Sequence, residues 1–390
     1  MLTLRGPRGP RRGPALNDLG IIADGGILIR DGIVEQVGPS RRLENLAAAR
    51  GAEEIDATGR VVMPGFVDSH THLIYPPPGS ESESEESAVA VLRSSSARLL
   101  EMRLRRYLEG MARHGTTTVE AKTGSGLDEK AEFKSLRTLH ALAGAVPQVM
   151  PTFLLRIPRA AAELDAARMI AEVAPGILRR RLARFADLWW DDYDAPSEWR
   201  VRYLETAAAN GIPLKMHASG PGCAAALALA IGHRAISVDH LEHISLEHAE
   251  LLAQSRTIAT LLPASPLHDG GPPPPARALV EAGAAVALAS NFNPLVTPVF
   301  NMQTVIALAC LQMALTPAEA ISAATINGAY TLGLGHRAGS LEPGKAADIL
   351  ILNVRDYRDV GRLWGGNMVH AAIKNGRMIY LEGAVAASAA

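Results

Sequence analysis

Eight short apolar runs, separated by helix-forming segments, constrain the fold of this chain more than any other feature. The runs lie near residues 66–72, 116–122, 147–153, 184–189, 212–217, 236–241, 257–262 and 285–290. Segments rich in Ala, Leu, Glu and Arg separate them, such as 97–113, 129–143 and 200–209. Strands that alternate with helices build a parallel sheet, and eight such units close into a barrel. The sequence therefore predicts an α/β fold, a (β/α)8 TIM-like barrel over residues 65–336.

The two ends of the chain carry a different pattern, which is typical of short antiparallel strands. The β-like runs are residues 26–30, 33–37, 347–352 and 369–374. Asp31-Gly32 separates the first two runs and Asn375-Gly376 follows the last, and both dipeptides are strong hairpin signals. Because neither end supplies enough strands to bury a face alone, we expect residues 1–64 and 337–390 to form one composite β-sandwich domain.

Composition and charge exclude several classes of function. The chain has 390 residues, 48% of them hydrophobic, and a formal net charge of −1, so it offers no charge field for nucleic acid or a membrane surface. No run approaches the roughly 18 apolar residues of a membrane span. Cys223 and Cys310 are too few for a disulfide framework, which favours a reducing cytoplasm. The start of the chain, where arginines alternate with Gly and Pro, predicts a flexible basic tail rather than a signal peptide.

Three histidines fall where predicted strands end. His70 and His72 close the first strand, and their spacing places both imidazoles on one face while Thr71 points away. His217 closes the fifth strand. Since the carboxyl ends of barrel strands meet at one face, these three imidazoles can hold one divalent ion, Zn or Fe, with a position left for water. The ion would acidify that water into a nucleophile near neutral pH. The alternative, histidines that only satisfy the core, explains the shared placement poorly.

Two further polar residues follow strands on the same face. His240 ends the sixth strand, where it could orient the water or polarise a substrate carbonyl, and Asn291 follows the eighth. We therefore predict His240 and Asn291 as the catalytic pair. The role of His243, so close to His240, stays open.

Several motifs resemble the metal-dependent amidohydrolase superfamily, and within it most closely the imidazolonepropionases, which hydrolyse a cyclic amide C–N bond. They are Pro64-Gly65-Phe66-Val67-Asp68-Ser69-His70-Thr71-His72, Gly115-Thr116-Thr117-Thr118-Val119-Glu120, Asp239-His240-Leu241-Glu242, Gly339 to Asp348, and, for the subgroup, Asn291-Phe292-Asn293-Pro294 with Thr325-Ile326-Asn327. The resemblance spans essentially the whole chain. It implies a mononuclear metal on His70, His72 and His217, a small-molecule substrate and a homodimer.

The chain departs from the family pattern at the residue after the eighth strand. Where the superfamily has an Asp that ligates the metal and shuttles a proton, this chain has Asn291. An amide is a poor ligand and takes no proton from water. Asp239, Glu242 and bulk water remain as alternative proton carriers.

The residues that bind the substrate in the family pattern are also different in this chain. The imidazolonepropionase pattern has an Arg soon after the His-x-His pair and a Tyr where this chain has Ser125. Arg156 either replaces the anion-binding Arg or faces solvent. Lys122 is a substrate contact, a structural ion pair or, least expected, a carbamate bridge. We predict Lys122, Ser125, Arg156 and Glu242 as substrate-binding residues.

Together these patterns predict a hydrolase that uses metal-activated water on a non-peptide, cyclic amide C–N bond. A deaminase or dipeptidase built on the same site is one alternative, because a fold does not fix its substrate. A catalytically impaired binding paralogue is the other, and the amide of Asn291 favours it.

Overall fold

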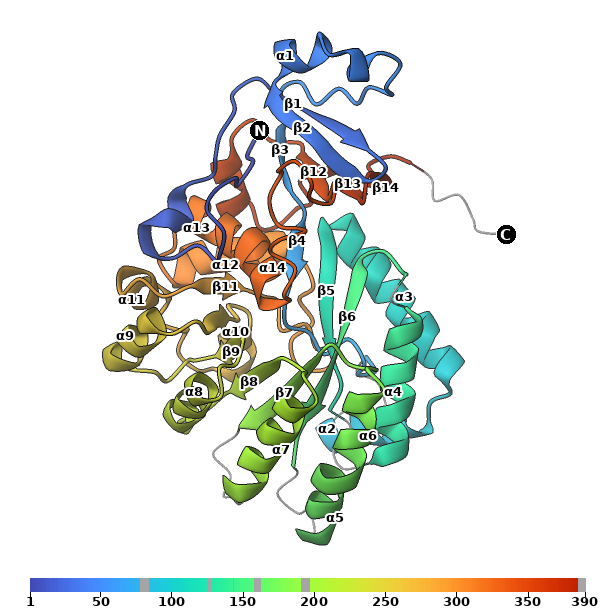
Figure 1. Ribbon diagram of the computed structural model, residues 1–390, viewed down its shortest axis with the longest axis vertical. Helices are drawn as coiled ribbons and strands as arrows, with labels where there is room; N and C mark the ends of the chain where they lie inside the picture. Colours follow the sequence, from blue (N-terminus) through green and yellow to red (C-terminus); the bar gives the residue numbers. More distant parts are fainter. Residues whose placement is uncertain (78–83, 125–127, 143, 158–162, 191–196, 385–390) are drawn as a thin grey trace.

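The computed structural model describes residues 1–77, 84–124, 128–142, 144–157, 163–190 and 197–384. A sheet of eight parallel strands forms its centre, in the order in which the strands occur along the chain (Figure 1). The strands are β4 (Phe66–Asp68), β5 (Thr116–Lys122), β6 (Gln148–Leu155), β7 (Phe185–Trp190), β8 (Leu214–Ala218), β9 (Ser237–His240), β10 (Ile258–Leu261) and β11 (Val286–Leu288). All eight predicted strands are present, which confirms the TIM-like barrel.

Hydrogen bonds beyond the ends of β4 and β11 bring the first and last strands together. The backbone N–H of Asn291 donates to the carbonyl of His70 at 3.1 Å, and that of His72 donates to Phe292 at 2.7 Å. Below them, the backbone N–H and hydroxyl of Ser290 donate to the Asp68 carboxylate at 3.0 and 2.6 Å. The seam of the barrel therefore sets Asn291 directly beside the two histidines of the first strand.

Helices cover the outside of the barrel (Figure 1). They are α2 (Glu85–Ser94), α3 (Ala97–Arg113), α4 (Glu129–Ala141), α5 (Glu163–Arg168), α6 (Ala174–Arg179), α7 (Ser197–Ala209), α8 (Cys223–Gly232), α9 (Leu246–Gln254), α10 (Ser265–Asp269), α11 (Ala276–Glu281), α12 (Met302–Gln312), α13 (Pro317–Ser322) and α14 (Gly328–Thr331). Helix α3 shows the local cause of this pattern: the hydroxyl of Ser96 accepts the backbone N–H of Leu99 at its start. Its buried residues recur every three or four positions along one face: Leu100, Leu104, Leu108 and Met111.

A second, antiparallel sheet takes strands from both ends of the chain. Its order is β14-β13-β12-β3, formed by β3 (Val61–Pro64), β12 (Ile349–Leu352), β13 (Val369–Lys374) and β14 (Arg377–Leu381). The hairpin of β1 (Gly25–Arg30) and β2 (Ile33–Pro39) lies above it (Figure 1). Asp31 and Gly32 turn this hairpin with φ of 51° and 79°, the left-handed values that such a two-residue turn requires.

Hydrophobic residues from both ends pack between the hairpin and the sheet. Val34 of β2 lies in one buried cluster with Leu341, Ala347 and Ile349, and Ile373 of β13 completes it. The backbone of Val34 also bonds to that of Lys345 at 2.8 Å. This packing supports a composite domain from both termini, and the exact division at residues 64 and 337 stays a prediction.

The N-terminal segment differs from the flexible basic tail that its composition predicted. The guanidinium of Arg11 is buried and donates to the carbonyls of Leu4 and Arg5 at 2.8 and 3.0 Å. The amide of Asn327 pairs with both backbone groups of Arg11 and donates to the carbonyl of Val286 in β11 at 2.7 Å. The tail prediction was wrong because the nearby carbonyls of Leu4 and Arg5 satisfy the guanidinium, and Asn327, far along the chain, holds the backbone of Arg11.

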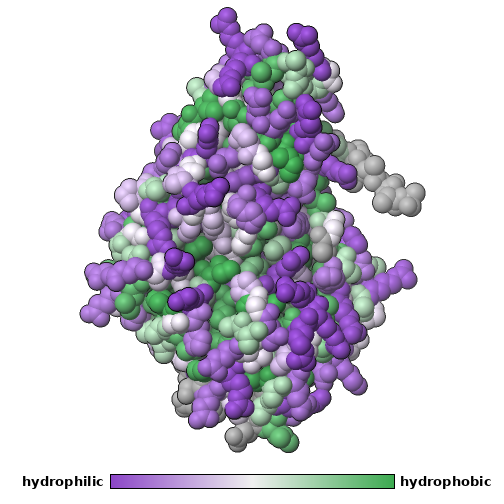
Figure 2. Space-filling model, in the orientation of Figure 1, coloured by the Kyte–Doolittle hydropathy of each residue, from purple (hydrophilic) through white to green (hydrophobic). Residues whose placement is uncertain are grey.

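Most of the molecular face in Figure 2 is hydrophilic, with hydrophobic side chains in smaller patches between the charged ones. Among the described residues, no helix has the length and apolar character that crossing a membrane requires.

Deletion of residues 347–390 should abolish cooperative folding, because it removes β12, β13 and β14 and leaves the apolar face of β3 uncovered. Deletion of residues 385–390 alone is the matched control and should keep the thermal transition of the full chain. Soluble yield and circular dichroism melting measure both variants. A 347–390 deletion that stays soluble and melts cooperatively would contradict the composite domain.

Candidate metal centre and active site

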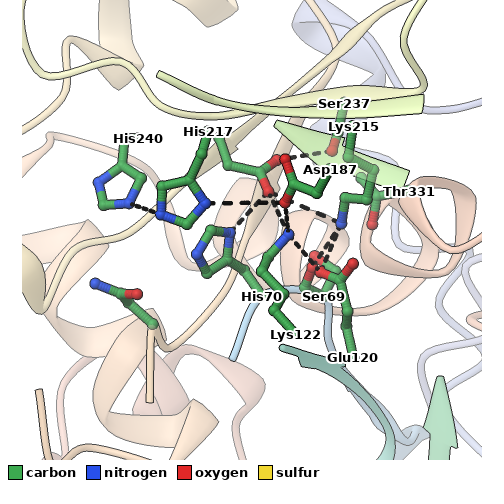
Figure 3. Close-up of polar contacts among 12 residues, drawn as sticks. Ser69, His70, Glu120, Lys122, Asp187, Lys215, His217, Ser237, His240 and Thr331 are labelled. Carbon is green, nitrogen blue, oxygen red and sulfur yellow. Dashed lines mark hydrogen bonds and ion pairs between the residues drawn. The ribbon is translucent and has the colours of Figure 1, made fainter. Parts of the chain in front are cut away.

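Three imidazoles meet at the carboxyl ends of the barrel strands. His70 follows β4, His217 lies in β8 and His240 ends β9. One nitrogen from each lies within 4.8 Å of the other two, and all three side chains are buried. The Nε2 atoms of His217 and His240 are 2.9 Å apart. Figure 3 shows the three rings side by side, with charged residues of neighbouring strands to their right.

His72 stands next to this cluster. Its ring centroid is 5.2 Å from that of His70 and 5.3 Å from that of His217. The structure thus brings the three predicted ligands His70, His72 and His217 together, and it also places the predicted catalytic residue His240 within ligand distance. His70 and His217 belong to both sets of three imidazoles, so the choice between His72 and His240 as third ligand stays a proposal. In the other group that could hold an ion, His70 with Glu120 and Asp239, the carboxylates are already bonded to Lys215 and Lys122.

The neighbours of His70 fix which of its nitrogens is available. Its Nδ1 lies 2.7 Å from Oδ2 of Asp239, and a carboxylate there requires Nδ1 to carry the proton. Its Nε2 is buried and has no hydrogen-bond partner. A buried, unpartnered nitrogen lone pair is costly unless something binds it, and a metal ion does so.

His217 is held by packing. The indole of Trp189 in β7 stacks on its ring with centroids 4.1 Å apart and planes at 17°. Oδ2 of Asp187 lies 3.8 Å from Nδ1 of His217, too far for a direct hydrogen bond. Burial, together with the neighbouring imidazoles and the Lys122 ammonium, lowers the pKa of His70, His72 and His217 well below the ordinary histidine value. All three are therefore neutral at pH 7, the form that ligates metals.

Five charged side chains form a buried network behind the histidines. They are Glu120, Lys122, Asp187, Lys215 and Asp239, and each is 0% exposed. Lys122 pairs with Asp187, and with Asp239 and Glu120 at 3.2 Å each. Lys215 donates to Glu120 at 2.6 Å and to the carbonyl of Ser69 at 2.9 Å. Every ammonium in the network therefore has an anionic partner, as buried charges require.

The network also sets the protonation states of Lys122 and Asp239. Burial alone would lower the pKa of Lys122, but the carboxylates of Asp187, Glu120 and Asp239 raise it above the ordinary value. Burial would raise the pKa of Asp239, yet Lys215 and Lys122 bring it down to about 2. Both groups are thus charged at neutral pH, and Asp239 holds His70 in one orientation.

The formal charges of the network suit a cation nearby. Three carboxylates and two ammonium groups leave one negative charge in surplus (−3 + 2 = −1), and the adjacent imidazoles are neutral. A divalent ion on the histidines would offset this surplus within the low-dielectric interior. The donor set and the charge behind it therefore fit a metal ion.

His240 forms a second pair on the cavity side. Its Nδ1 lies 3.1 Å from Oε1 of Glu242. Burial would lower the pKa of His240, but the Glu242 carboxylate raises it above the ordinary value, and His240 in return lowers the pKa of Glu242. The contact therefore favours a protonated His240 beside an ionised Glu242.

Asn291 adopts the left-handed conformation, with φ of 55°, which Asn tolerates better than most residues. Its Nδ2 donates to the hydroxyl of Ser265 at 2.7 Å, so its carbonyl oxygen is directed elsewhere. It lines the same cavity of about 610 Å³ as His72, His217, His240 and Glu242. That volume is within the usual range of small-molecule sites.

The predicted substrate contacts lie in different places. Glu242 lines the cavity, whereas Lys122 is fully buried in the ion-pair network, which favours the structural ion pair among its alternatives. Arg156 follows β6 and packs with its guanidinium carbon 4.5 Å from the ring centroid of Trp189. Ser125 lies outside the described residues.

Asp187, Lys215 and Trp189 belong to the site although no sequence pattern pointed to them, and Glu120 had no predicted role of its own. A usable signal was present, because Glu120 and Lys215 interrupt strands that a parallel barrel buries on both sides. Charged residues in such strands indicate a paired network, although the partners cannot be read from one strand.

A parallel eight-stranded barrel with converging neutral imidazoles at its carboxyl end defines a class, the metal-dependent barrel hydrolases. Comparison with known proteins places the chain within this class. The model of the Amidohydrolase family matches residues 61–379. The imidazolonepropionase of Solibacter usitatus is 37% identical, over 98% of this chain and 97% of its own length, and that of Deinococcus radiodurans is 36% identical, over 96% and 95%.

Solved structures agree on the fold. E. coli guanine deaminase has a TM-score of 0.74 at 17% identity and covers 97% of both chains. The 5-methylcytosine deaminase of Klebsiella pneumoniae has a TM-score of 0.73 at 17% identity, over 92% of this chain and 95% of its own. The chain belongs to the amidohydrolase family. It is a metal-dependent hydrolase of a non-peptide C–N bond and resembles imidazolonepropionases along nearly its whole length.

Replacing His70 and His72 together with Ala should abolish stoichiometric metal, because both candidate ligand sets lose a member. The single variants His72→Ala and His240→Ala identify the third ligand, since loss of the true ligand should lower the metal content more. Elemental analysis of purified protein measures the content. His336→Ala, an exposed histidine, is the control. Unchanged metal in the double variant would refute the site.

Lys122→Met should lower the free energy of unfolding by about 3–5 kcal/mol, because it leaves Asp187 and Asp239 buried without their shared cation. Urea unfolding with the metal chelated measures this effect. Lys130→Met removes the same charge from an exposed position and should change stability by less than about 0.5 kcal/mol. Equal stability of the two variants would contradict the compensating role of Lys122.

Proposed function

We propose that this chain opens a five-membered cyclic amide related to an imidazolone, with zinc or iron held by His70, His72 and His217, which leaves His240 for proton transfer. The observation that carries the proposal is the buried, unpartnered Nε2 of His70 beside the other imidazoles. The name that the curated relatives share, imidazolonepropionase, supports this ring type. When bound, the divalent ion supplies Lewis-acid chemistry, which lowers the pKa of a water toward about 7.

The side chains of the cavity must move one proton. Hydrolysis forms a bond from the water oxygen to the amide carbon, the C–N bond breaks, and a proton passes from the water to the departing ring nitrogen. We assign this transfer to His240 and Glu242, which lie 3.1 Å apart and line the cavity. Asp239 is excluded from the task by position, since its oxygens bond to His70, Lys122 and Ser237 behind the histidines.

Asn291 takes a positioning role in this proposal. An amide accepts no proton at neutral pH, and its Nδ2 is held by Ser265. Its carbonyl oxygen can only accept a hydrogen bond. Proton transfer in this chain therefore depends on His240 and Glu242. A carboxylate at position 291 would offer a second group that can accept the proton.

We further propose a cytoplasmic location and a homodimer. Two cysteines without a disulfide, Cys223 and Cys310, support a reducing compartment. The homodimer rests on the family resemblance alone.

The test uses purified full-length protein with zinc or iron and a panel of five-membered cyclic amides. Ring opening is measured as the loss of the absorbance of the ring. The activity should require metal, stop when the metal is chelated and return when the metal is added back. The His70→Ala/His72→Ala variant should be inactive. A stoichiometrically loaded protein that opens no ring in the panel would overturn the proposal and favour an impaired paralogue.

Asn291→Asp should raise the rate of ring opening and the metal affinity, because it restores a carboxylate that can ligate and accept a proton. General-base assistance is typically worth about 10² to 10⁴ in rate. Asn293→Asp adds the same charge to the same cavity at another position and is the matched control. Steady-state kinetics and metal titration measure both variants. A lower rate in Asn291→Asp than in the parent would show that the native proton path excludes this position.

A further inference from the structure

Trp189 and His217 are direct neighbours in the barrel. Strand β7 pairs with β8 in parallel, and the register sets Trp189 opposite His217. Paired residues of neighbouring strands point to the same face of a sheet, and successive residues of one strand alternate between faces. Two positions earlier, the same register sets Asp187 opposite Lys215, and both belong to the buried charged network. The sheet itself therefore brings the indole and the imidazole together on the inner face.

His217 lacks the hydrogen bond that usually orients a metal ligand. A histidine that binds a metal through one nitrogen generally donates from the other to a carboxylate or a carbonyl. His70 has such a bond, to Asp239 at 2.7 Å. The Nε2 of His217 faces that of His240 at 2.9 Å, and its Nδ1 is buried with no hydrogen-bond partner among the described residues. Oδ2 of Asp187 is 3.8 Å from that Nδ1, beyond hydrogen-bond range.

Stacking supplies a constraint that the missing hydrogen bond does not. The torsion that turns an imidazole about its Cβ–Cγ bond has only broad preferred ranges, so packing decides the direction of the ring. The planes of the indole and of the His217 ring differ by 17°, with centroids 4.1 Å apart, so rotation of the imidazole would drive its edge into the indole. The indole also has neighbours of its own. The guanidinium carbon of Arg156 lies 4.5 Å from its ring centroid, and the centroid of the His72 ring lies 6.1 Å away.

We propose that Trp189 is a positioning residue of the metal centre, whose stacked indole fixes the direction of His217 Nε2 in place of a hydrogen bond to Nδ1. The inference rests on the metal site of the proposed function and is independent of the substrate. The two ligands that β4 and β8 supply are then oriented by different means, His70 by a carboxylate and His217 by a flat aromatic surface. Tight metal binding in this chain therefore requires an aromatic ring at position 189.

The experiment measures the zinc dissociation constant of the purified full chain without substrate. Trp189→Leu removes the flat surface and should raise this constant about 10- to 100-fold, the usual effect of losing a residue that orients a metal ligand. Trp189→Phe puts a ring back against His217 and should recover most of the affinity. Trp190→Leu is the matched control, because the neighbouring side chain points to the other face, where the guanidinium carbon of Arg200 lies 3.7 Å from its ring centroid. It should leave the zinc dissociation constant unchanged.

A second readout reports the geometry of the ligands directly. Cobalt in place of zinc gives d–d absorption bands that depend on how the ligands are arranged around the ion. At saturating cobalt, Trp189→Leu should show altered bands, whereas Trp189→Phe and Trp190→Leu should keep the bands of the parent. If Trp189→Leu yields no folded protein, Trp189→Met, which keeps a long apolar side chain without a ring, gives the same comparison.

Thermal melting of the metal-free proteins separates positioning from packing. If Trp189→Leu melts at a lower temperature but binds zinc and absorbs with cobalt like the parent, Trp189 only packs and the inference is overturned. A parent chain that binds no zinc would overturn the metal site and this inference together. A parent that binds zinc and opens no ring, with the expected order of affinities among the variants, would overturn the proposed substrate and support the role of Trp189.

Discussion

The central constraint of this structure is the compensation of charge inside the barrel. Glu120, Lys122, Asp187, Lys215 and Asp239 come from four strands, β5, β7, β8 and β9, and meet in the dry interior. An isolated charge there would cost several kcal/mol, so each side chain depends on partners that other strands supply. The network aligns the strands and, through Asp239, orients His70. Stability and the geometry of the metal centre therefore rest on the same contacts.

Hydrogen bonds at the seam between β4 and β11 fix the position of Asn291 relative to the histidines. Asp68 accepts two hydrogen bonds from Ser290, and the backbones of His70 and Asn291 are bonded just beyond it. Residues more than 200 positions apart in the sequence thus occupy fixed neighbouring places. Asn291 has a positive φ at this seam, a conformation that Asn tolerates. A change of side chain at position 291 alters the chemistry there, whereas the backbone hydrogen bonds of the seam do not depend on it.

Family membership and substrate choice rest on different parts of the molecule. The deaminases share the fold at 17% identity, which shows that the barrel admits more than one chemistry. Asn291, which separates this chain from the family pattern, lies in the loop after β11. Loops tolerate substitution because they contribute little to the core, so specificity can change while the charged network and the fold persist.

The sequence by itself determined the local elements and the order in which they occur. Asp31-Gly32 and Asn375-Gly376 specify hairpins through their tolerance of positive φ, and the spacing of His70 and His72 specifies two imidazoles on one face. Local patterns suffice for such features because neighbours in the chain decide them. Only the tertiary structure decided which charges meet, such as Lys122 with Asp187, that Trp189 stacks on His217, and that Asn327 holds the backbone of Arg11. Those contacts join residues far apart in the chain, and their energy depends on burial that no local pattern reveals.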